Sequence, residues 1–357
     1  MTEQPRKLPP MRVAVVANLK GQLATPLPTP DAEAEFDQQS TIDALCAAIA
    51  SDGHQVSFLP GDATFPVRVR EIQPDICFNI AEGMYGDARE AHIPAVLELY
   101  QIPYTASRVL TNAVTLDKVL TKRIWQQHGL PTAQFQVFVS GTERLATNLV
   151  FPLFVKPACE GSGKGMDAGS IVHTVDALYT RVRWIIAQYA QPALVESYLP
   201  GREFTVGIVG GSRARHASRM PQHYAPDGYM RLPILEIESS TSVTPGVYGT
   251  ANKTLAIADE GVASFICPAP LDAATYAELY RLAIAAHEVV GANDISRVDM
   301  RFDAAGMPHL IEINALPGMT PDFSDLFLMT NAAGLAYNDV ILEILYLAAY
   351  RYGIFDQ

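Results

Sequence analysis

The sequence predicts an α/β protein with more than one domain, in which the first domain is built on a parallel sheet. The chain has 357 residues, more than one typical domain contains. Hydrophobic residues make up 49% of it and charged residues 18%, which is typical of globular proteins with sizeable cores. Strand-like and helix-like segments alternate in the N-terminal part, and such alternation is typical of a parallel sheet.

The N-terminal part begins with a buried strand over residues 11–21 that runs into a loop. Three prolines in residues 21–35 exclude one regular element there. The elements that follow are helices over 41–52 and 87–100 and strands over 54–60, 75–80 and 102–105. Ligands of parallel sheets bind at the carboxyl ends of the strands, so we expect a site there.

The middle of the chain predicts a compact α+β unit. An amphipathic helix ends at Gly129, and the strands and helix after it are expected over 133–139, 149–157, 170–174, 175–190 (the helix) and 193–199. A third region opens with a strand over 202–211 and contains a Ser-, Thr- and Gly-rich loop, 239–252. A helix over 273–291, a hairpin of strands 297–303 and 309–315, and terminal helices complete it.

Charge and cysteine content exclude several classes of protein. The net charge is −12 with no long basic block, so we expect no non-specific nucleic-acid binding. The four cysteines lie far apart, without metal-ligand spacing or a disulfide framework. No apolar run reaches about 18 residues. We therefore expect a cytoplasmic protein that does not enter a membrane.

The segment "FVKPACEGSGKGM", residues 154–166, is a glycine loop between two strands. It is not a Walker A motif, because Ala158 and Gly165 stand where that motif needs glycine and Ser or Thr. Its glycines allow backbone N–H groups to turn toward an anion, but a plain glycine turn has the same composition. Lys156 ends an apolar strand and needs an anion, unless it lies at an edge and reaches solvent.

The last hairpin carries two carboxylates and an amide, Asp299, Glu312 and Asn314. Side chains alternate along strands, which predicts that Arg297, Asp299 and Arg301 share one face. The same alternation places Leu310 with Glu312 and Asn314, and Ile311 with Ile313 on the other face. Three oxygen ligands without histidine or cysteine suit Mg²⁺. The alternative is a solvated polar face with an ion pair between Arg297 and Glu312.

Together these segments resemble the ATP-grasp superfamily, and within it the D-alanine–D-alanine ligase family. The motifs occur in family order: "FNIAEG", "GDAREAHIPAVLE", "LDKVLTKRIW", "FVKPACEGSGKGM", "LVESYLPGREFTV", "SRVDMRFD" and "LIEINALPGMT". The resemblance implies an ATP-grasp fold with an N-terminal domain over 1–110, a central lobe over 111–204 and a C-terminal lobe over 205–357. The last lobe would carry the metal site and a lid formed by the 239–252 loop.

The resemblance also assigns roles. Residues that match nucleotide-binding positions are Lys118, Lys156, Glu160, Gly161, Ser162, Gly163, Lys164, Glu196, Leu199, Glu203 and Ile311. Glu196 and Leu199 would read adenine and Glu203 the ribose. Asp299, Glu312 and Asn314 match the ligands of Mg²⁺, or of Mn²⁺ in its place. Ser162, Lys253, Arg297 and the Gly318 N–H match groups at the reacting centre. Without the resemblance, Lys118, Glu196 and Glu203 read as ordinary surface residues.

The implied reaction joins a small carboxylic acid to an amine. A carboxylate would attack the γ-phosphate of ATP, and the amine would then attack the acyl phosphate to form an amide. Two alternatives remain open: a kinase-type ATP-grasp enzyme that stops after phosphoryl transfer, and a non-catalytic nucleotide-binding protein. Relatives of this kind are often homodimers, so we expect a homodimer by resemblance alone.

The substrate side departs from the family pattern. Glu82 precedes Gly83 where the family typically has His-Gly. It would hold a substrate ammonium group or a second cationic group, or form a structural ion pair with Arg89 or another arginine. Gly163-Lys164 replaces the usual serine and apolar residue. The acid that would hold an amino group is Glu35 or Asp37, and Ser324 would contact the second substrate's carboxylate. These departures favour an acid and an amine other than D-alanine.

Overall fold

The protein is described by a computed structural model that covers residues 7–22, 29, 31–211, 214–239, 246–249 and 263–354. The strands are β1 (Arg12–Ala17), β2 (Gln55–Pro60), β3 (Ile76–Asn79), β4 (Phe135–Phe138), β5 (Leu153–Pro157), β6 (Ile171–Val172), β7 (Ala193–Ser197), β8 (Glu203–Val209), β9 (Leu235–Glu238), β10 (Ser264–Ile266), β11 (Ile295–Phe302) and β12 (Pro308–Asn314).

The described residues also form helices. The α-helices are α1 (Gln39–Ala50), α2 (Phe65–Ile72), α3 (His92–Leu99), α4 (Val109–Leu116), α5 (Lys118–Gln127), α6 (Val175–Tyr189), α7 (Ala214–Ala217), α9 (Ala273–Val289), α10 (Asp325–Ala332) and α11 (Tyr337–Arg351). Three short 3₁₀ turns are η1 (Arg89–Ala91), η2 (Ala168–Ser170) and η3 (Pro221–His223).

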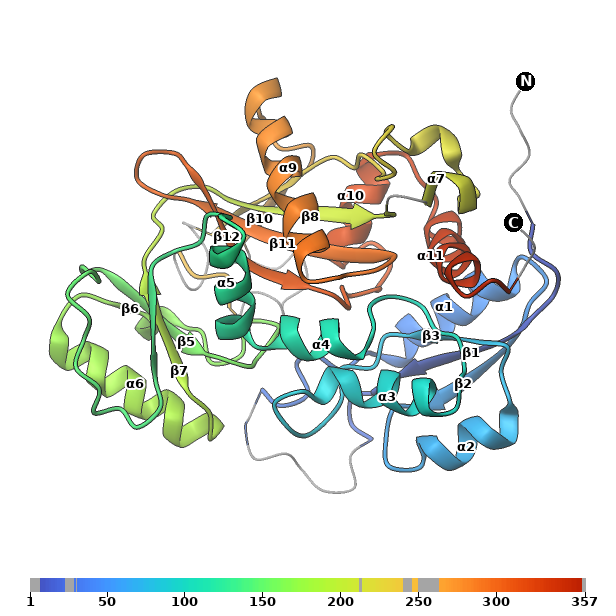
Figure 1. Ribbon diagram of the computed structural model, residues 1–357, viewed down its shortest axis with the longest axis horizontal. Helices are drawn as coiled ribbons and strands as arrows, with labels where there is room; N and C mark the ends of the chain where they lie inside the picture. The colour runs from blue at the N-terminus through green and yellow to red at the C-terminus, as the bar shows by residue number, and fades with distance from the viewer. Residues whose placement is uncertain are drawn as a thin grey trace.

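The N-terminal sheet is parallel, as predicted, with the strand order β2-β1-β3. Alternation along β1 sends Val13 and Val15 into the core that contains α1 and α11. Ala14 and Val16 face the opposite core, which contains α2 and α3. The sheet is therefore covered on both faces (Figure 1), which explains why nearly all of β1 is apolar.

Some predicted elements in this part differ in the structure. The helix expected over 87–100 begins as the turn η1 and continues as α3, and the sequence analysis missed α2. The strand expected over 102–105 is only a single bridge between Cys77 and Tyr104. Isolated bridges depend on one backbone contact, so side-chain alternation does not reveal them.

The helix predicted to end at Gly129 is interrupted at Asp117, which separates α4 from α5. The backbone of Asp117 is extended, and its carboxylate caps α5 by accepting hydrogen bonds from the N–H groups of Val119 and Leu120, both at 2.9 Å. The interruption makes Lys118 the first residue of a new helix. Gly129 has the left-handed backbone expected just after a helix.

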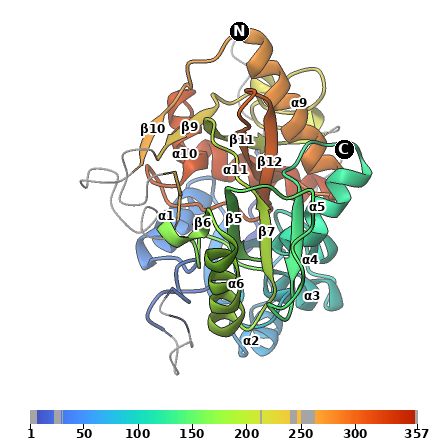
Figure 2. The same ribbon diagram turned by 90° about the vertical axis from the view of Figure 1, so that its left-hand side faces the viewer.

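The central sheet has the strand order β4-β7-β5-β6 and is antiparallel throughout. Helix α6 covers one face and packs on residues of β5 and β7 (Figure 2). The glycine loop connects β5 to β6, so the prediction of a loop between two antiparallel strands is confirmed.

The C-terminal sheet has the order β10-β9-β8-β11-β12, and α9 packs on one of its faces. The hairpin β11–β12 places Asp299 directly opposite Glu312. A bulge then shifts the register, so that Met300 pairs with Leu310. Leu310 therefore joins Ile313 in the core, while Ile311 lines a pocket, and the strict alternation predicted for 310–314 is wrong at Leu310 and Ile311.

The three sheets lie at residues 12–79, 135–197 and 203–314 of the chain. The domain boundaries at 110/111 and 204/205 stay a prediction. In the part of the chain that the structure describes, no single helix is long and apolar enough to cross a membrane; α10 and α11 pass that test only together, with a bend of 111° between them.

Two glycines with similar backbones allow a stability prediction. Gly83 and Gly129 have φ of +75° and +69°, but a Cβ on Gly83 would lie 2.3 Å from the Arg89 carbonyl oxygen, whereas Gly129 has open space. Gly129→Ala should lower the free energy of unfolding by about 1 kcal/mol through backbone strain alone. Gly83→Ala should lower it by about 3 kcal/mol or more, because backbone must also move. Urea unfolding of both variants measures the difference, and equal losses would contradict the close approach.

Candidate active site

Two pockets adjoin each other: the smaller lies between the central and C-terminal sheets, and the larger is lined by the N-terminal part, the glycine loop and the C-terminal part. The smaller one gathers five residues predicted to bind nucleotide: Lys156, Glu196, Leu199, Glu203 and Ile311. The larger one gathers eleven further residues predicted for the site: Glu35, Asp37, Glu82, Lys118, Gly161, Ser162, Arg297, Glu312, Asn314, Gly318 and Ser324. Tyr248 lines both pockets, so they meet at one wall. The tertiary structure thus brings together residues that lie far apart in the sequence.

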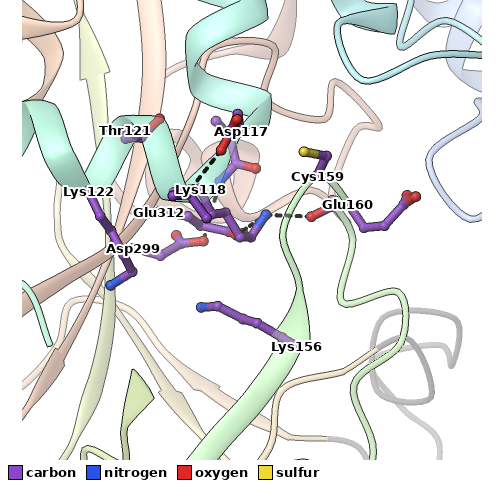
Figure 3. Close-up of polar contacts among 12 residues, drawn as sticks. Asp117, Lys118, Thr121, Lys122, Lys156, Cys159, Glu160, Asp299 and Glu312 are labelled. Atoms are coloured by element: carbon purple, nitrogen blue, oxygen red, sulfur yellow. Dashed lines mark hydrogen bonds and ion pairs between the residues drawn. The ribbon is translucent and has the colours of Figure 1, made fainter. Parts of the chain in front are cut away.

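Lys118 lies where the two lobes meet (Figure 3). Its Nζ is 2.9 Å from Glu312 Oε2 on β12 and donates a hydrogen bond to the Glu160 carbonyl of the glycine loop. The residue is 7% exposed, so the interpretation as a helix-surface lysine is wrong. A buried ammonium group needs this anion. The ion pair therefore holds a cation where α5, the glycine loop and β12 meet.

A second buried cluster lies behind the smaller pocket. Glu196 on β7 is 2.7 Å from Lys156 Nζ and 2.8 Å from Lys122 Nζ. All three residues are buried, which excludes both the strand-end carboxylate and the solvent-reaching lysine. Burial opposes ionisation of Glu196, but Lys122 and then Lys156 outweigh it and lower its pKa to about 2. Glu196 is therefore an anion that pairs with two lysines beside the pocket.

The predicted metal ligands lie together on β11 and β12. Asp299 Oδ2 is 3.3 Å from the Asn314 amide nitrogen, and Glu312 is the direct cross-strand neighbour of Asp299. Asp299 also accepts hydrogen bonds from Thr205 Oγ at 2.5 Å and from Arg297 Nε at 3.2 Å. Two carboxylates and an amide on adjacent strands are the oxygen donors that Mg²⁺ prefers, so these residues fit the ion. No group of three His, Cys, Asp or Glu side chains suited to a metal occurs among the described residues.

Arg297 and the end of the larger pocket form a connected set. Arg297 is 3.2 Å from Asp325 as well as from Asp299, so the alternative of a pair with Glu312 is not what the structure contains. These carboxylates raise the pKa of Arg297 further despite its burial. Gly318 lies beside Ser324, where a Cβ would come within 2.8 Å of the serine hydroxyl. Both Gly318 and Ser324 line the pocket together with Arg297.

The glycine loop is fastened to the N-terminal part by charge. Lys164 Nζ is 2.6 Å from Glu160 and 2.7 Å from Glu35, and Arg89 is 3.0 Å from the same two carboxylates. The Gly161 N–H also donates to Glu35, at 2.7 Å. Ser162, Gly163 and Gly165 have positive φ, which turns the loop over the larger pocket. Glu35 of the N-terminal part therefore binds the loop at Lys164 and Gly161, in addition to the loop's own backbone hydrogen bonds.

The ion pairs of Arg89 and Lys164 determine which N-terminal carboxylates face the pocket. Glu35 already accepts bonds from Arg89, Lys164 and Gly161. Arg89 forms its ion pairs with Glu35 and Glu160, and the described residues contain no ion pair between Arg89 and Glu82. Glu82 therefore faces the pocket instead of forming the structural pair with Arg89. Asp37 also lines the pocket, and burial raises its pKa to about 7 against the opposing effect of Lys20.

Lys253 and most of the 239–252 loop lie outside the described residues. The described piece 246–249 reaches the glycine loop, since a Cβ on Gly249 would lie 2.4 Å from the Met166 carbonyl oxygen. Arg301 fixes this piece by donating to the Gly246 carbonyl at 2.8 Å, while it pairs with Glu203 at 3.4 Å. The lid role of the loop stays a prediction.

Sequence reasoning missed several residues at the site. Lys122 lies one turn after Lys118 on α5, a spacing that places both on one helix face and would have revealed it. Glu90 lines the larger pocket from η1 and carries no such signal. Thr205 and Asp325 hold Asp299 and Arg297 from other elements, and only the folded chain brings them there.

The fold and the two pockets define an ATP-grasp protein, and comparisons with known proteins agree. The family model described as "D-ala D-ala ligase C-terminus" matches residues 124–346. A D-alanine–D-alanine ligase from Nitrosococcus oceani is 34% identical over 71% of this chain and 71% of its own, and one from Bordetella avium is 32% identical over 75% and 76%. An uncharacterized protein of Sinorhizobium fredii is 31% identical over 96% of this chain and 98% of its own.

The solved structure of D-alanine–D-alanine ligase from Bacillus anthracis in complex with ATP has the same fold, with a TM-score of 0.70. It is 21% identical, and the match covers 96% of this chain and 99% of that one. The chain belongs to the D-alanine–D-alanine ligase family.

The Glu196 cluster predicts how stability depends on pH. The folded-state pKa of about 2 lies below the ordinary value of 4.5, so the ion pairs contribute fully above that value and are lost as the pH falls toward 2. Glu196→Gln leaves two buried lysines without an anion and should lower the free energy of unfolding at pH 7 by about 3–5 kcal/mol. Urea unfolding from pH 5 to pH 3 should then show a shallower loss for the variant. Equal slopes in the two proteins would refute the assignment.

Proposed function

We propose that the protein is an ATP-dependent ligase that joins a carboxylic acid to an amine and releases ADP and phosphate. The observation that carries this proposal is the ion pair between Lys118 and Glu312, which both line the larger pocket. Arg297, suited to hold an acid, lines the same pocket, and Glu196 and Glu203, suited to hold adenine and ribose, line the adjoining smaller one. The relatives named D-alanine–D-alanine ligase support the same reaction class.

The smaller pocket would hold the nucleoside, with Lys156 and Lys118 directed at its phosphates. Both lysines are buried and held by ion pairs to Glu312 and Glu196, which lowers the cost of ordering them on binding. Asp299, Glu312 and Asn314 would hold Mg²⁺. That ion would offset charge on the phosphoryl group when bound.

The first half of the reaction transfers a phosphoryl group. An oxygen of the acid attacks the γ-phosphorus, the bond from that phosphorus to the bridging oxygen breaks, and ADP leaves. Lys118, Ser162 and the glycine loop cover this part of the larger pocket and would exclude water from the acyl phosphate. Lys253 would add a further cation from the lid.

The second half forms the amide. The amine nitrogen attacks the acyl carbon, the carbon–oxygen bond to phosphate breaks, and the amine loses a proton. Arg297 and the Gly318 N–H line this end of the pocket and would stabilise the developing oxyanion. Their presence favours a ligase over an enzyme that stops at phosphoryl transfer. Ser324, at the start of α10, would contact the carboxylate of the amine substrate.

We further propose that the acid and the amine differ from D-alanine. Glu82 brings a carboxylate to the pocket where the family typically has a titratable ring, and Lys164 holds Glu35 to the glycine loop. We also propose that the protein is a cytoplasmic homodimer and that its domain boundaries lie at 110/111 and 204/205.

Hydroxylamine tests the proposal without knowledge of the amine, because it traps acyl phosphates as hydroxamates. Purified protein, Mg²⁺ and ATP are incubated with hydroxylamine and a panel of amino acids and simple carboxylic acids. We expect at least one acid to give ADP and hydroxamate in equal amounts. ADP formation that never requires an acid would contradict the ligase reaction.

Substitution of a predicted metal ligand tests the role of Mg²⁺ most directly. Glu312→Gln should lower kcat by about 100-fold or more, because charge stabilisation by the metal amounts to several kcal/mol. Glu278→Gln is the control, since that residue lies on α9 and, among the described residues, pairs with Arg281 on the same helix. Chelation of the metal with EDTA should abolish turnover of the wild type. Unchanged turnover in Glu312→Gln would refute the metal assignment.

A further inference from the structure

Arg301 lines the smaller pocket but has no part in the reaction proposed above. It is the next-to-last residue of β11, and it shares the pocket with Glu203, the carboxylate suited to hold ribose. The register of the sheet pairs Arg301 with Glu203 across β11 and β8, so the two residues are cross-strand neighbours. Each of the two side chains is 12% exposed. A guanidinium as enclosed as this one has to be held by acceptors of the protein.

Each nitrogen of the guanidinium has such an acceptor. Nε donates to the Gly201 carbonyl at 3.2 Å, and Nη2 donates to the Tyr198 hydroxyl at 3.2 Å. Nη1 donates to the Gly246 carbonyl at 2.8 Å and lies 3.4 Å from Glu203 Oε2. The acceptors belong to two separate stretches of chain, the start of β8 with the turn before it and a piece that follows β9. A planar group with donors in several directions reaches all of them.

The piece that follows β9, residues 246–249, forms a cover segment, two of whose side chains line the smaller pocket. Its first residue packs closely on one wall, since a Cβ on Gly246 would lie 2.8 Å from the Tyr198 hydroxyl. Its last residue, Gly249, packs on the glycine loop. Arg301 therefore holds the first end of a segment that crosses the pocket from one wall to the glycine loop.

The pairing with Arg301 also limits how Glu203 can lie. One oxygen of the carboxylate is directed at Nη1, which restricts the rotation of the group. Hydrogen bonds from hydroxyl groups to a carboxylate are charge-assisted, and their strength depends on its orientation. An acceptor that is already oriented costs less to order when a ligand binds. The guanidinium thus prepares Glu203 to accept hydrogen bonds in the pocket that both residues line.

We infer that Arg301 is a positioning residue for the nucleotide, which orients Glu203 toward the ribose hydroxyls and fastens the cover segment over the same pocket. The inference rests on the proposed function in one respect, that the nucleoside occupies the smaller pocket. Recognition of ribose and enclosure of the nucleotide then depend on a single guanidinium. A change that releases Glu203 also releases the cover segment.

Nucleotides that lack one hydroxyl test the role in ribose recognition. Calorimetry with Mg²⁺ measures the Kd of ADP, 2′-deoxyADP and 3′-deoxyADP for the wild type and for Arg301→Gln. In the wild type we expect ADP to bind at least about 30-fold more tightly than the weaker analogue, which leaves a buried acceptor unpaired. In Arg301→Gln this ratio should fall below about 5, through loss of ADP affinity. Equal affinities in the wild type, or an unchanged ratio in the variant, would overturn the inference.

A double-mutant cycle separates positioning from direct contact. Glu203→Gln and Arg301→Gln are made singly and together, and the same ratio of affinities is measured. Because Arg301 acts through Glu203, the double variant should lose no more discrimination than Glu203→Gln alone. Losses that add up would show that Arg301 contacts ribose itself, against the positioning role. Arg281→Gln is the control and should keep the wild-type ratio, since that arginine is exposed on α9 and pairs with Glu278.

Hydrogen exchange tests the hold on the cover segment without a catalytic readout. Exchange is followed by mass spectrometry in the wild type and in Arg301→Gln, both saturated with ADP and Mg²⁺. Loss of the bond to the Gly246 carbonyl should speed exchange in the peptide that contains 246–249 about tenfold or more. The peptide that contains α1 should exchange as in the wild type, which excludes a general loosening. Equal exchange of the 246–249 peptide in the two proteins would overturn the inference.

Arg301→Lys separates the charge from the shape of the side chain, and it replaces Arg301→Gln if circular dichroism shows that the glutamine variant is unfolded. Lysine keeps the positive charge but has one donor nitrogen, which cannot reach acceptors on both stretches of chain. We expect the ratio of affinities to fall at least about threefold, with faster exchange in the 246–249 peptide. A wild-type ratio with wild-type exchange would mean that charge alone is sufficient, and would overturn the inference.

The two proposals can fail separately. Binding of ADP that depends on Arg301 as described, without hydroxamate formed from any acid, would contradict the ligase reaction and support the role of Arg301. Hydroxamate formation by a protein whose preference for ADP survives in Arg301→Gln would support the ligase reaction and overturn the role of Arg301.

Discussion

The cleft is organised by the need to give each buried ammonium group a carboxylate. Lys118, Lys156 and Lys164 are all nearly inaccessible to solvent, and a charge in that position is costly without a partner. The partners come from three different places: Glu312 on β12, Glu196 on β7 and Glu35 in the N-terminal segment. The ion pairs therefore connect both antiparallel sheets and the N-terminal segment around one cleft.

The same constraint prepares the cleft for phosphate. The lysines are already desolvated and directed inward, so a phosphate group only has to replace or share the carboxylates that hold them. Glu82 and Glu90 also line the cleft, and among the described residues neither forms an ion pair within 4 Å.

Much of the fold and part of the site could be predicted from the sequence. Apolar runs and turn residues predicted the parallel sheet and the carboxylate hairpin, and the ordered motifs indicated the ATP-grasp fold. Alternation placed Asp299 and Glu312 together, which the register confirms. It failed at Leu310, because a bulge depends on how two strands pair and leaves no pattern within one strand.

Other features depend on contacts between distant segments. The sequence predicted a substrate role for Glu35 or Asp37, but Arg89 and Lys164 bind Glu35 across 54 and 129 residues of chain. No local pattern encodes such a pairing. The break between the two helices at Asp117 could have been predicted, because an aspartate before a helical run is a typical cap. That prediction would have made Lys118 the first residue of a helix. The helix period would then have placed Lys122 on the same face as Lys118.

The most direct test of the account follows one oxygen atom. The preferred acid is prepared with oxygen-18 in its carboxylate and turned over with ATP, Mg²⁺ and an amine, and the released phosphate is analysed by mass spectrometry. The account predicts one labelled oxygen in each phosphate, because the acid's oxygen attacks phosphorus and then leaves with it. Phosphate without label, formed together with ADP, would show that water and not the carboxylate receives the phosphoryl group, and would contradict the account.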